Sequence, residues 1–187
     1  MVQIVISRRK HTGIVIILAL IVNFVFSVPV YASDDVERSG EIIRIILPLT
    51  AVGMTVYHDD QEGLIQFSKS FLTTLGASYA LKYSINTDRP DGGSHSFPSG
   101  HTSTAFSGAS FLQRRYGWRY GIPAYIAASF VGWSRIESDN HYLKDVLAGA
   151  ALGVISTYIF THPYTKGITA TPFLGEGQYG ILLSAAF

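Results

Sequence analysis

The chain has 187 residues, of which 48% are hydrophobic and only 14% are charged; its formal net charge is +1, and it contains no cysteine. This length predicts one domain with a substantial core, and the low charged fraction favours membrane association. The small net charge, without a basic stripe, argues against nucleic-acid binding. The lack of cysteine excludes disulfides, thiolate metal sites and cysteine nucleophiles.

Residues 1–32 are expected to form an export segment. A basic cluster at 8–10 precedes an apolar run over 14–28, and Val30 and Ala32 supply the small residues of a cleavage site. This order is typical of a secretory signal peptide. The apolar run is close to the upper length of a signal core, so an uncleaved N-terminal membrane anchor is the alternative. Both interpretations export the rest of the chain.

Two largely apolar helices are expected next. After a polar stretch that begins at residue 33, a helix over 41–57 contains Pro48, where we expect a kink, and the polar turn 58–63 ends it. A second helix over 64–84 has good helix formers with apolar spacing. It carries Lys82 near its carboxyl end.

The segment 88–101, DRPDGGSHSFPSGH, is rich in turn formers and is expected to be a loop. Its last residues lead directly into the helix-forming run 102–106, so Ser99 is expected to cap a new helix. The free N–H groups at such a helix end attract anions. The sequence therefore predicts an anion site where the loop meets the helix.

Three further helices are expected over 101–116, 121–133 and about 141–161, the first and last rich in small residues that allow close packing. The predicted fold class is all-α. A bundle of about five core helices occupies residues 33–165, after the N-terminal signal or anchor helix, and residues 166–187 form a C-terminal tail for which the sequence predicts no function.

The apolar segments are about 15 to 20 residues long, close to the ~20 that cross a bilayer. If the chain starts in the cytoplasm and each segment crosses, the basic clusters 8–10 and 114–119 both lie in the cytoplasm, as the positive-inside rule favours. The same threading gathers the loop 88–101 and the segment 134–141 on the far side. A membrane-embedded bundle is therefore expected, with a soluble periplasmic bundle as the alternative.

Fixed spacings connect the loop with groups before and after it. Lys82 precedes Arg89 by six intervening residues, Arg135 precedes His141 by five, and His141 precedes Asp145 by three. The three cations, with Ser99 and the Gly100 N–H group, could clamp phosphoryl oxygens, and the histidines could supply a nucleophile and an acid. This is what phosphoryl transfer without a metal requires.

The two histidines are distinguished by their neighbours. On the expected last helix, His141 and Asp145 share a face, so the carboxylate can orient the ring and leave its other nitrogen basic. That pairing favours His141 as the nucleophile. His101, in the first turn of its helix, is placed to protonate the leaving oxygen. From the residues alone, either histidine could be the nucleophile.

Three motifs carry a family resemblance: Lys82…Arg89-Pro90, Pro98-Ser99-Gly100-His101 and Ser134-Arg135…His141…Asp145. In this order they resemble the signature of the type 2 phosphatidic acid phosphatase superfamily, which also includes class A acid phosphatases and vanadium haloperoxidases. The resemblance covers about residues 42–162, and no motif position departs from it. It implies His141 as the nucleophile, Asp145 as its orienting partner and His101 as the general acid.

We therefore expect a metal-independent phosphatase, without a cofactor, that hydrolyses phosphate monoesters or diphosphates of membrane lipids through a phosphohistidine intermediate. Its expected location is the bacterial inner membrane, with the active site facing the periplasm. The main alternative is a soluble periplasmic acid phosphatase acting on small phosphate esters. A vanadate-dependent peroxidase and a non-catalytic phospholipid-binding protein are further alternatives.

Overall fold

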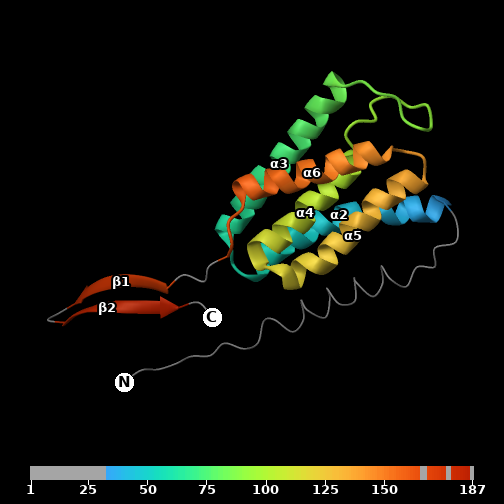
Figure 1. Ribbon diagram of the computed structural model, residues 1–187. Coiled ribbons are helices and arrows are strands. Elements are labelled where there is room, and N and C mark those ends of the chain that lie inside the picture. The colour runs from blue at the N-terminus through green and yellow to red at the C-terminus, as the bar shows by residue number, and fades with distance from the viewer. Residues whose placement is uncertain (1–32, 165–167, 176–177, 186–187) are drawn as a thin grey trace.

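The computed structural model describes residues 33–164, 168–175 and 178–185 (Figure 1). The predicted signal or anchor segment, 1–32, lies outside the described residues. The described helices are α2 (Ser33–Tyr57), α3 (Gln61–Ser84), α4 (Gly100–Tyr116), α5 (Trp118–Glu137) and α6 (Leu143–Phe160). The all-α bundle predicted for this part of the chain is confirmed.

The C-terminal tail contains structure that its sequence did not predict. Strands β1 (Ile168–Gly175) and β2 (Gln178–Ala185) pair antiparallel, with Ile168 opposite Ala185 and Gly175 opposite Gln178. The tail is rich in Gly and Thr, but it also contains residues of high strand propensity. The strands were not predicted, because this part of the chain was searched for helical patterns. Within the described residues, the tail forms a β-hairpin that follows the five helices.

Helix α4 lies at the centre of the bundle and packs against α2, α3, α5 and α6 (Figure 1). Ala105 and Ala109, both fully buried, leave room for the neighbouring helices, and Phe111, also fully buried, fills the larger space beside Phe67. Because so many small residues line α4, the surrounding helices approach it closely. Helix α4 is therefore fixed in place by four neighbouring helices.

Two glycines of helix α6 lie directly against the backbone of α4 and of the residue that caps it. A Cβ atom on Gly149 would lie 2.4 Å from the Ser99 carbonyl oxygen, and one on Gly153 would lie 2.6 Å from that of Ser103. Contacts this short require the helices to move apart. The glycines of the predicted small-residue series therefore set the spacing of α4 and α6.

We expect Gly149→Ala to lower the free energy of unfolding by about 1–3 kcal/mol, because the methyl group overpacks the α4–α6 contact. Gly76→Ala on α3 is the matched control: its Cβ would meet nothing within 4 Å, so the substitution should be neutral or stabilise by up to ~1 kcal/mol. Thermal unfolding in detergent micelles measures both. Equal stability of the two variants would contradict the close packing.

Helix α2 differs from its predicted extent. It begins at Ser33 rather than at residue 41, and it runs through Pro48 as one helix. The polar first turns are stabilised by long-range contacts, since Glu37 and Glu41 both bond to the guanidinium of Arg135. Local sequence patterns do not show such partners. The additional turns bring two carboxylates to the end of the bundle where α4 and α6 begin.

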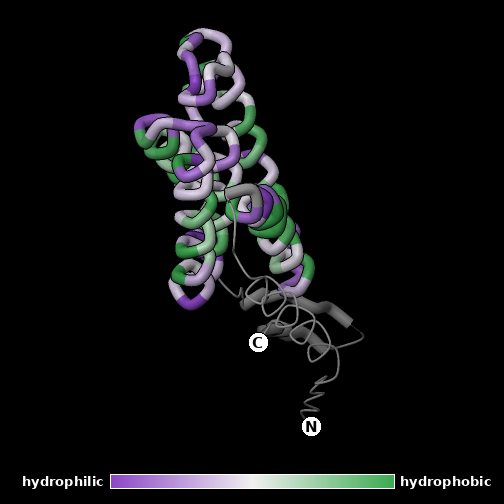
Figure 2. The backbone as a smooth tube through the Cα atoms, turned by 90° about the vertical axis from the view of Figure 1, so that its right-hand side faces the viewer, coloured by the Kyte–Doolittle hydropathy of each residue, from purple (hydrophilic) through white to green (hydrophobic). Residues whose placement is uncertain are grey.

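Two helices, α2 over Asp35–Tyr57 and α6 over Leu143–Phe160, are long and apolar enough to cross a membrane, judged by length and composition. Figure 2 shows hydrophobic stretches along the helices and hydrophilic ones at the turns between them. Large apolar side chains are exposed on several helices: Ile45, Leu49, Val56, Leu72, Ile122, Ile126, Leu147, Ile155 and Ile159. Exposed apolar surface on this scale is unusual for a soluble monomer.

A buried ion pair between Asp60 and Arg115 lies at the end of the bundle where α3 begins and α4 ends. Asp60 caps α3 by accepting from Gly63 N at 2.8 Å, and its carboxylate accepts from Arg115 Nε at 2.7 Å and Nη2 at 2.5 Å. Arg115 Nη1 also donates to the carbonyl oxygen of His162 at 3.0 Å. One carboxylate and one guanidinium therefore tie the start of α3, the end of α4 and the segment after α6 together.

Candidate active site

A pocket of about 170 Å³ lies at the end of the bundle where α3 ends and α4 begins. It brings together five of the eight residues predicted for the site: Lys82, Arg89, Gly100, His101 and His141. The other residues that line it are Arg44, Leu75, Ser78, Tyr79 and Thr104. Ser99, Arg135 and Asp145 are buried and do not belong to this lining. Arg135 and Asp145 contact His141, which does line the pocket.

The predicted helix cap is confirmed. Ser99 is the N-cap of α4, and its hydroxyl oxygen accepts from Thr102 Oγ1 at 3.0 Å and, over a longer 3.4 Å, from Thr102 N. Ser99 is fully buried, and its N–H donates to the carbonyl oxygen of Asp145 at 2.9 Å. The hydroxyl thus fixes the start of α4 rather than facing the pocket, so contact between Ser99 and a phosphate remains a prediction.

Gly100 lines the pocket, where its first-turn backbone is available to a ligand. A Cβ on this residue would lie no closer than 3.7 Å to a protein atom, the nearest being Lys82 Cε. Packing within the protein therefore does not require glycine here. Close approach of a bound group to the backbone is a requirement that glycine would meet.

His141 contacts Asp145, as predicted, but through a different local structure. The helix α6 begins at Leu143, so His141 precedes it, and the argument from a shared helix face was wrong. His141 N donates to the carbonyl oxygen of Arg135, whereas the Asp145 carboxylate accepts from Tyr142 N at 3.0 Å as part of a capping box. The turn before α6, not the helix, brings the two side chains together.

Ser96 completes this arrangement and was missed from the sequence. Its hydroxyl donates to Asp145 Oδ2 at 2.5 Å and lies 3.4 Å from His141 Nδ1, and Asp145 Oδ2 is 3.7 Å from the same ring nitrogen. All three side chains are buried. Since Nδ1 faces the hydroxyl and the carboxylate, Nε2 is the nitrogen of His141 that remains for chemistry.

The surroundings keep His141 neutral. Burial, followed by the positive charges of Lys82 and Arg89, lowers the pKa of His141 to about 4, although Asp145 acts in the opposite direction. The ring is therefore in its basic form at every pH well above 4. A nucleophilic imidazole must be unprotonated, so this electrostatic setting suits that role.

This setting predicts a measurable titration. In NMR spectra of the detergent-solubilised protein, His141 should titrate near pH 4, and Lys82→Met should raise its pKa because a nearby cation no longer opposes protonation. Lys69→Met, which removes an exposed lysine of the same helix, should leave the titration unchanged. Titration of wild-type His141 near its ordinary value would contradict this description.

Lys82 and Arg89, two of the three cations predicted to bind phosphate, line the pocket and differ in their hydrogen bonds. Lys82 Nζ donates to the carbonyl oxygen of His95 at 2.8 Å and lies 3.4 Å from that of Ser96, so it also anchors the loop. Arg89 Nε is buried and has no hydrogen-bond partner within the part of the chain that the structure describes. A buried donor without a partner is costly unless a ligand satisfies it, which fits an anion site.

Arg135 and His101 both contact Glu41, a residue that was not predicted to belong to the site. Glu41 Oε1 lies 2.6 Å from His101 Nε2 and accepts from Arg135 Nη1 at 3.1 Å. Arg135 is almost fully buried, and its Nη2 donates to the carbonyl oxygen of Glu37 at 2.6 Å. The signal for Glu41 in the sequence was an acidic residue at the start of a largely apolar helix, because charges inside membrane helices are usually functional.

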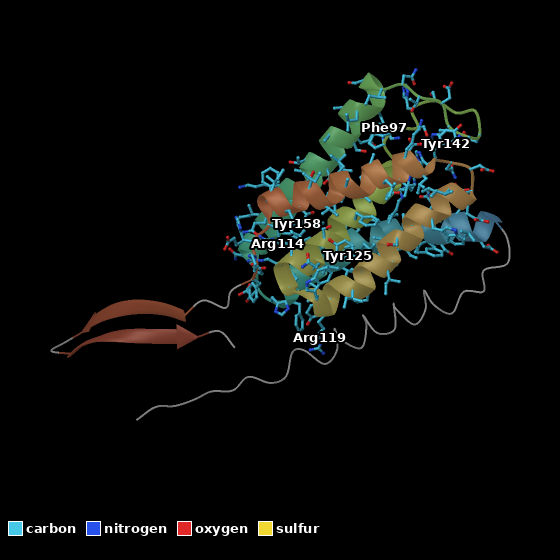
Figure 3. All side chains as sticks on the ribbon, in the orientation of Figure 1. Phe97, Arg114, Arg119, Tyr125, Tyr142 and Tyr158 are labelled. Carbon is cyan, nitrogen blue, oxygen red and sulfur yellow. The ribbon has the colours of Figure 1, made fainter. Side chains whose placement is uncertain are left out.

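The two ends of the bundle differ in the residues they display. Figure 3 shows Phe97 and Tyr142 at the end where α4 and α6 begin, and Arg114 and Arg119 at the opposite end. Every motif residue belongs to the first end, by its place at the start or end of its helix. The basic turn and the candidate active site are therefore separated by the length of the helices.

The family model described as PAP2 superfamily matches residues 81–168, a stretch that includes all three motifs. The predicted resemblance is confirmed, and with it the enzyme class expected from the motifs, a phosphoric ester hydrolase of the PAP2 type. The match begins next to Lys82 and continues beyond Asp145.

The chain is similar to several lipid phosphatases. The lipid A 4'-phosphatase of Helicobacter pylori is 28% identical over 92% of this chain and 96% of its own length. A lipid A 1-phosphatase of the same species is 29% identical over 64% of this chain and 68% of its own length. The lipid A 1-phosphatase of Porphyromonas gingivalis is 46% identical over 43% of this chain, which spans only 19% of that relative.

Two solved structures share the fold. The structure of Aquifex aeolicus LpxE has a TM-score of 0.52 and 21% identity, covering 63% of this chain and 82% of that chain. The transmembrane PAP2-type phosphatidylglycerolphosphate phosphatase from Bacillus subtilis has a TM-score of 0.50 and 22% identity, covering 81% of this chain and 86% of that chain. These similarities support the helical architecture expected from the sequence.

Proposed function

We propose that this protein is a metal-independent phosphatase that removes phosphate from a membrane lipid through a phosphohistidine intermediate on His141. The observation that carries the proposal is the pocket itself, in which His141 and His101 line one small space together with Lys82 and Arg89. Two histidines and fixed cations around one space can supply a nucleophile, an acid and charge stabilisation for phosphoryl transfer.

The reaction proceeds in two steps. His141 Nε2 attacks phosphorus, and the bond between phosphorus and the leaving oxygen breaks as His101 donates a proton to that oxygen. Water then attacks the phosphohistidine while His101 takes a proton from it, which releases phosphate and restores His141. Lys82, Arg89 and the Gly100 N–H group, which line the pocket, stabilise the phosphoryl oxygens in both steps. Contact between Arg135, which does not line the pocket, and a phosphate remains a prediction.

The size of the pocket favours a lipid substrate. At about 170 Å³ it is smaller than the ~300–1,000 Å³ of pockets that enclose whole ligands, so it takes a phosphate headgroup and leaves the rest of the substrate outside. Leu75 and Tyr79 line one side of it, and Tyr79 and Tyr83 on the same end of α3 are exposed. Exposed aromatic rings at a helix end suit the interface between lipid and water.

We propose that the bundle is embedded in a bacterial inner membrane, with the pocket on the periplasmic side. The candidate spans α2 and α6, the exposed apolar side chains and the basic turn at the end opposite the pocket support this orientation. The relatives named as lipid A phosphatases make phosphorylated lipid A the first substrate to test.

The proposal is tested by phosphate release in EDTA from lipid A, phosphatidylglycerol phosphate, phosphatidic acid, a polyprenyl diphosphate and soluble phosphate esters. We expect release from at least one lipid, at a higher kcat/KM than from any soluble ester. Preference for soluble esters would indicate the broad-specificity acid phosphatase instead. A requirement for a divalent metal would contradict the proposed chemistry.

A further inference from the structure

Glu41 belongs to none of the three motifs, but its carboxylate contacts residues of the candidate site. Its Oε1 lies 2.6 Å from His101 Nε2 and 3.1 Å from Arg135 Nη1, and its Oε2 accepts from Arg44 Nε at 3.0 Å. One side chain of α2 thus contacts the expected general acid and two guanidinium groups. It reaches a region otherwise built from α4 and α5, so tertiary packing places it there.

The position of Glu41 in the chain makes these contacts informative. It belongs to the candidate membrane span Asp35–Tyr57, and its neighbours Ile42 and Ile45 are about half exposed, as expected for residues that face lipid. An ionisable residue in such a helix is costly unless it faces the protein interior and is paired. Glu41 is paired, because its carboxylate contacts His101 and two guanidinium groups, although 38% of the side chain is exposed.

The two histidines of the site have corresponding surroundings. His141 has the Asp145 carboxylate 3.7 Å from Nδ1, which leaves Nε2 for the substrate. His101 has the Glu41 carboxylate on Nε2, and its Nδ1 makes no hydrogen bond within the described residues. A carboxylate on one ring nitrogen fixes the tautomer and the orientation of the ring, so that the other nitrogen faces the reaction.

We propose that Glu41 is a positioning residue that orients His101 through Nε2, so that Nδ1 faces the leaving oxygen. This inference rests on the proposed function. His101 enters this step as an imidazolium, with Nε2–H donated to Glu41 and a second proton on Nδ1. As His141 Nε2 forms its bond to phosphorus and the phosphorus–oxygen bond breaks, the proton on Nδ1 passes to the leaving oxygen and leaves His101 neutral. When water attacks the phosphohistidine, Nδ1 takes back a proton, and the negative charge of Glu41 stabilises the resulting imidazolium.

The dependence of the rate on the leaving group separates this role from a structural one. The substrates are an alkyl phosphate and a nitrophenyl phosphate that carry the same hydrocarbon chain. An alkoxide needs protonation, whereas nitrophenolate leaves readily without it. We expect Glu41→Gln to lower kcat/KM, which reports the step that expels the leaving group, by about 10–100-fold for the alkyl phosphate and much less for the nitrophenyl phosphate.

Further variants assign the effect to His101. Glu41→Asp, which keeps the charge, should restore part of the rate on the alkyl phosphate. Adding Glu41→Gln to His101→Ala should cause little further loss, because the two residues act as one unit. Glu37→Gln is the matched control: it removes a carboxylate 3.5 Å from Arg135 that makes no contact with His101, so the ratio of the two rates should stay as in wild type.

Other outcomes overturn the inference in distinct ways. An equal loss on both substrates would mean that Glu41 supports only the structure of the site. A gain on both would mean that its carboxylate occupies the place of a phosphate oxygen and hinders binding. If the wild-type protein hydrolyses neither substrate nor any phosphorylated lipid, the proposed function fails, and the inference fails with it.

Discussion

His141→Ala is expected to lower kcat by about 10³-fold or more on every substrate that the wild-type protein hydrolyses, because the substitution removes the atom that bonds to phosphorus. His141 is buried, and its side chain contacts Ser96 of the loop 88–101 and Asp145 in the first turn of α6. Phosphate release from purified variants in detergent micelles measures the effect.

His162→Ala is the matched control for this prediction. His162 is exposed and lies after α6, at the end of the bundle away from the pocket, where only its backbone bonds to Arg115 and Gln66. Its loss should leave phosphate release close to wild type. Substantial turnover by folded His141→Ala protein would contradict the nucleophile assignment and would favour direct attack by water.

Asp60→Ala is expected to lower the free energy of unfolding by about 3–5 kcal/mol, because it leaves the buried guanidinium of Arg115 without its carboxylate. The same substitution removes the cap of α3 and the acceptor of Tyr116 Oη. Burial raises the pKa of Asp60, but the hydrogen bonds from Arg115, Gly63 N–H and Tyr116 outweigh it and hold the pKa below its ordinary value.

The sign of this shift predicts a pH dependence. Since the folded-state pKa lies below the unfolded one, the stabilisation from Asp60 is present above the unfolded value and is lost as the pH falls through the folded value. Thermal unfolding in micelles, measured from neutral to acidic pH, compares Asp60→Ala with Asp59→Asn, a neighbouring carboxylate that lacks the Arg115 contact. The difference in melting temperature should shrink as the pH falls. Equal melting temperatures for the two variants would contradict a stabilising role for the buried pair.

Helices and motifs were largely predictable from the sequence because each depends on local patterns. Apolar stretches bounded by polar turns marked α3, α4 and α5 to within a few residues, and the serine before Gly100 marked the cap of α4. Pairing of His141 with Asp145 was also predicted, but for the wrong structural reason. The capping box that starts α6 at Leu143 depends on the backbone of Tyr142, which spacing alone does not reveal.

Residues that were missed act through tertiary contacts. Ser96 is one serine among several polar residues of its loop, and only the folded loop brings it to Asp145. Glu41 lies sixty positions before His101 in the chain, and α2 must pack beside α4 and α5 before the two side chains meet. The first turns of α2 were predicted as non-helical because their partners, Arg135 and Asn140, lie a hundred residues away.

The central claim is that His141 carries the phosphoryl group during turnover. The most direct measurement is rapid quenching of the wild-type protein during hydrolysis of a ³²P-labelled substrate, followed by mapping of the label in the protein. We predict an acid-labile, alkali-stable phosphoryl group on His141, and none in His141→Ala. Active wild-type protein that carries no label, or carries it on another residue, would contradict the account.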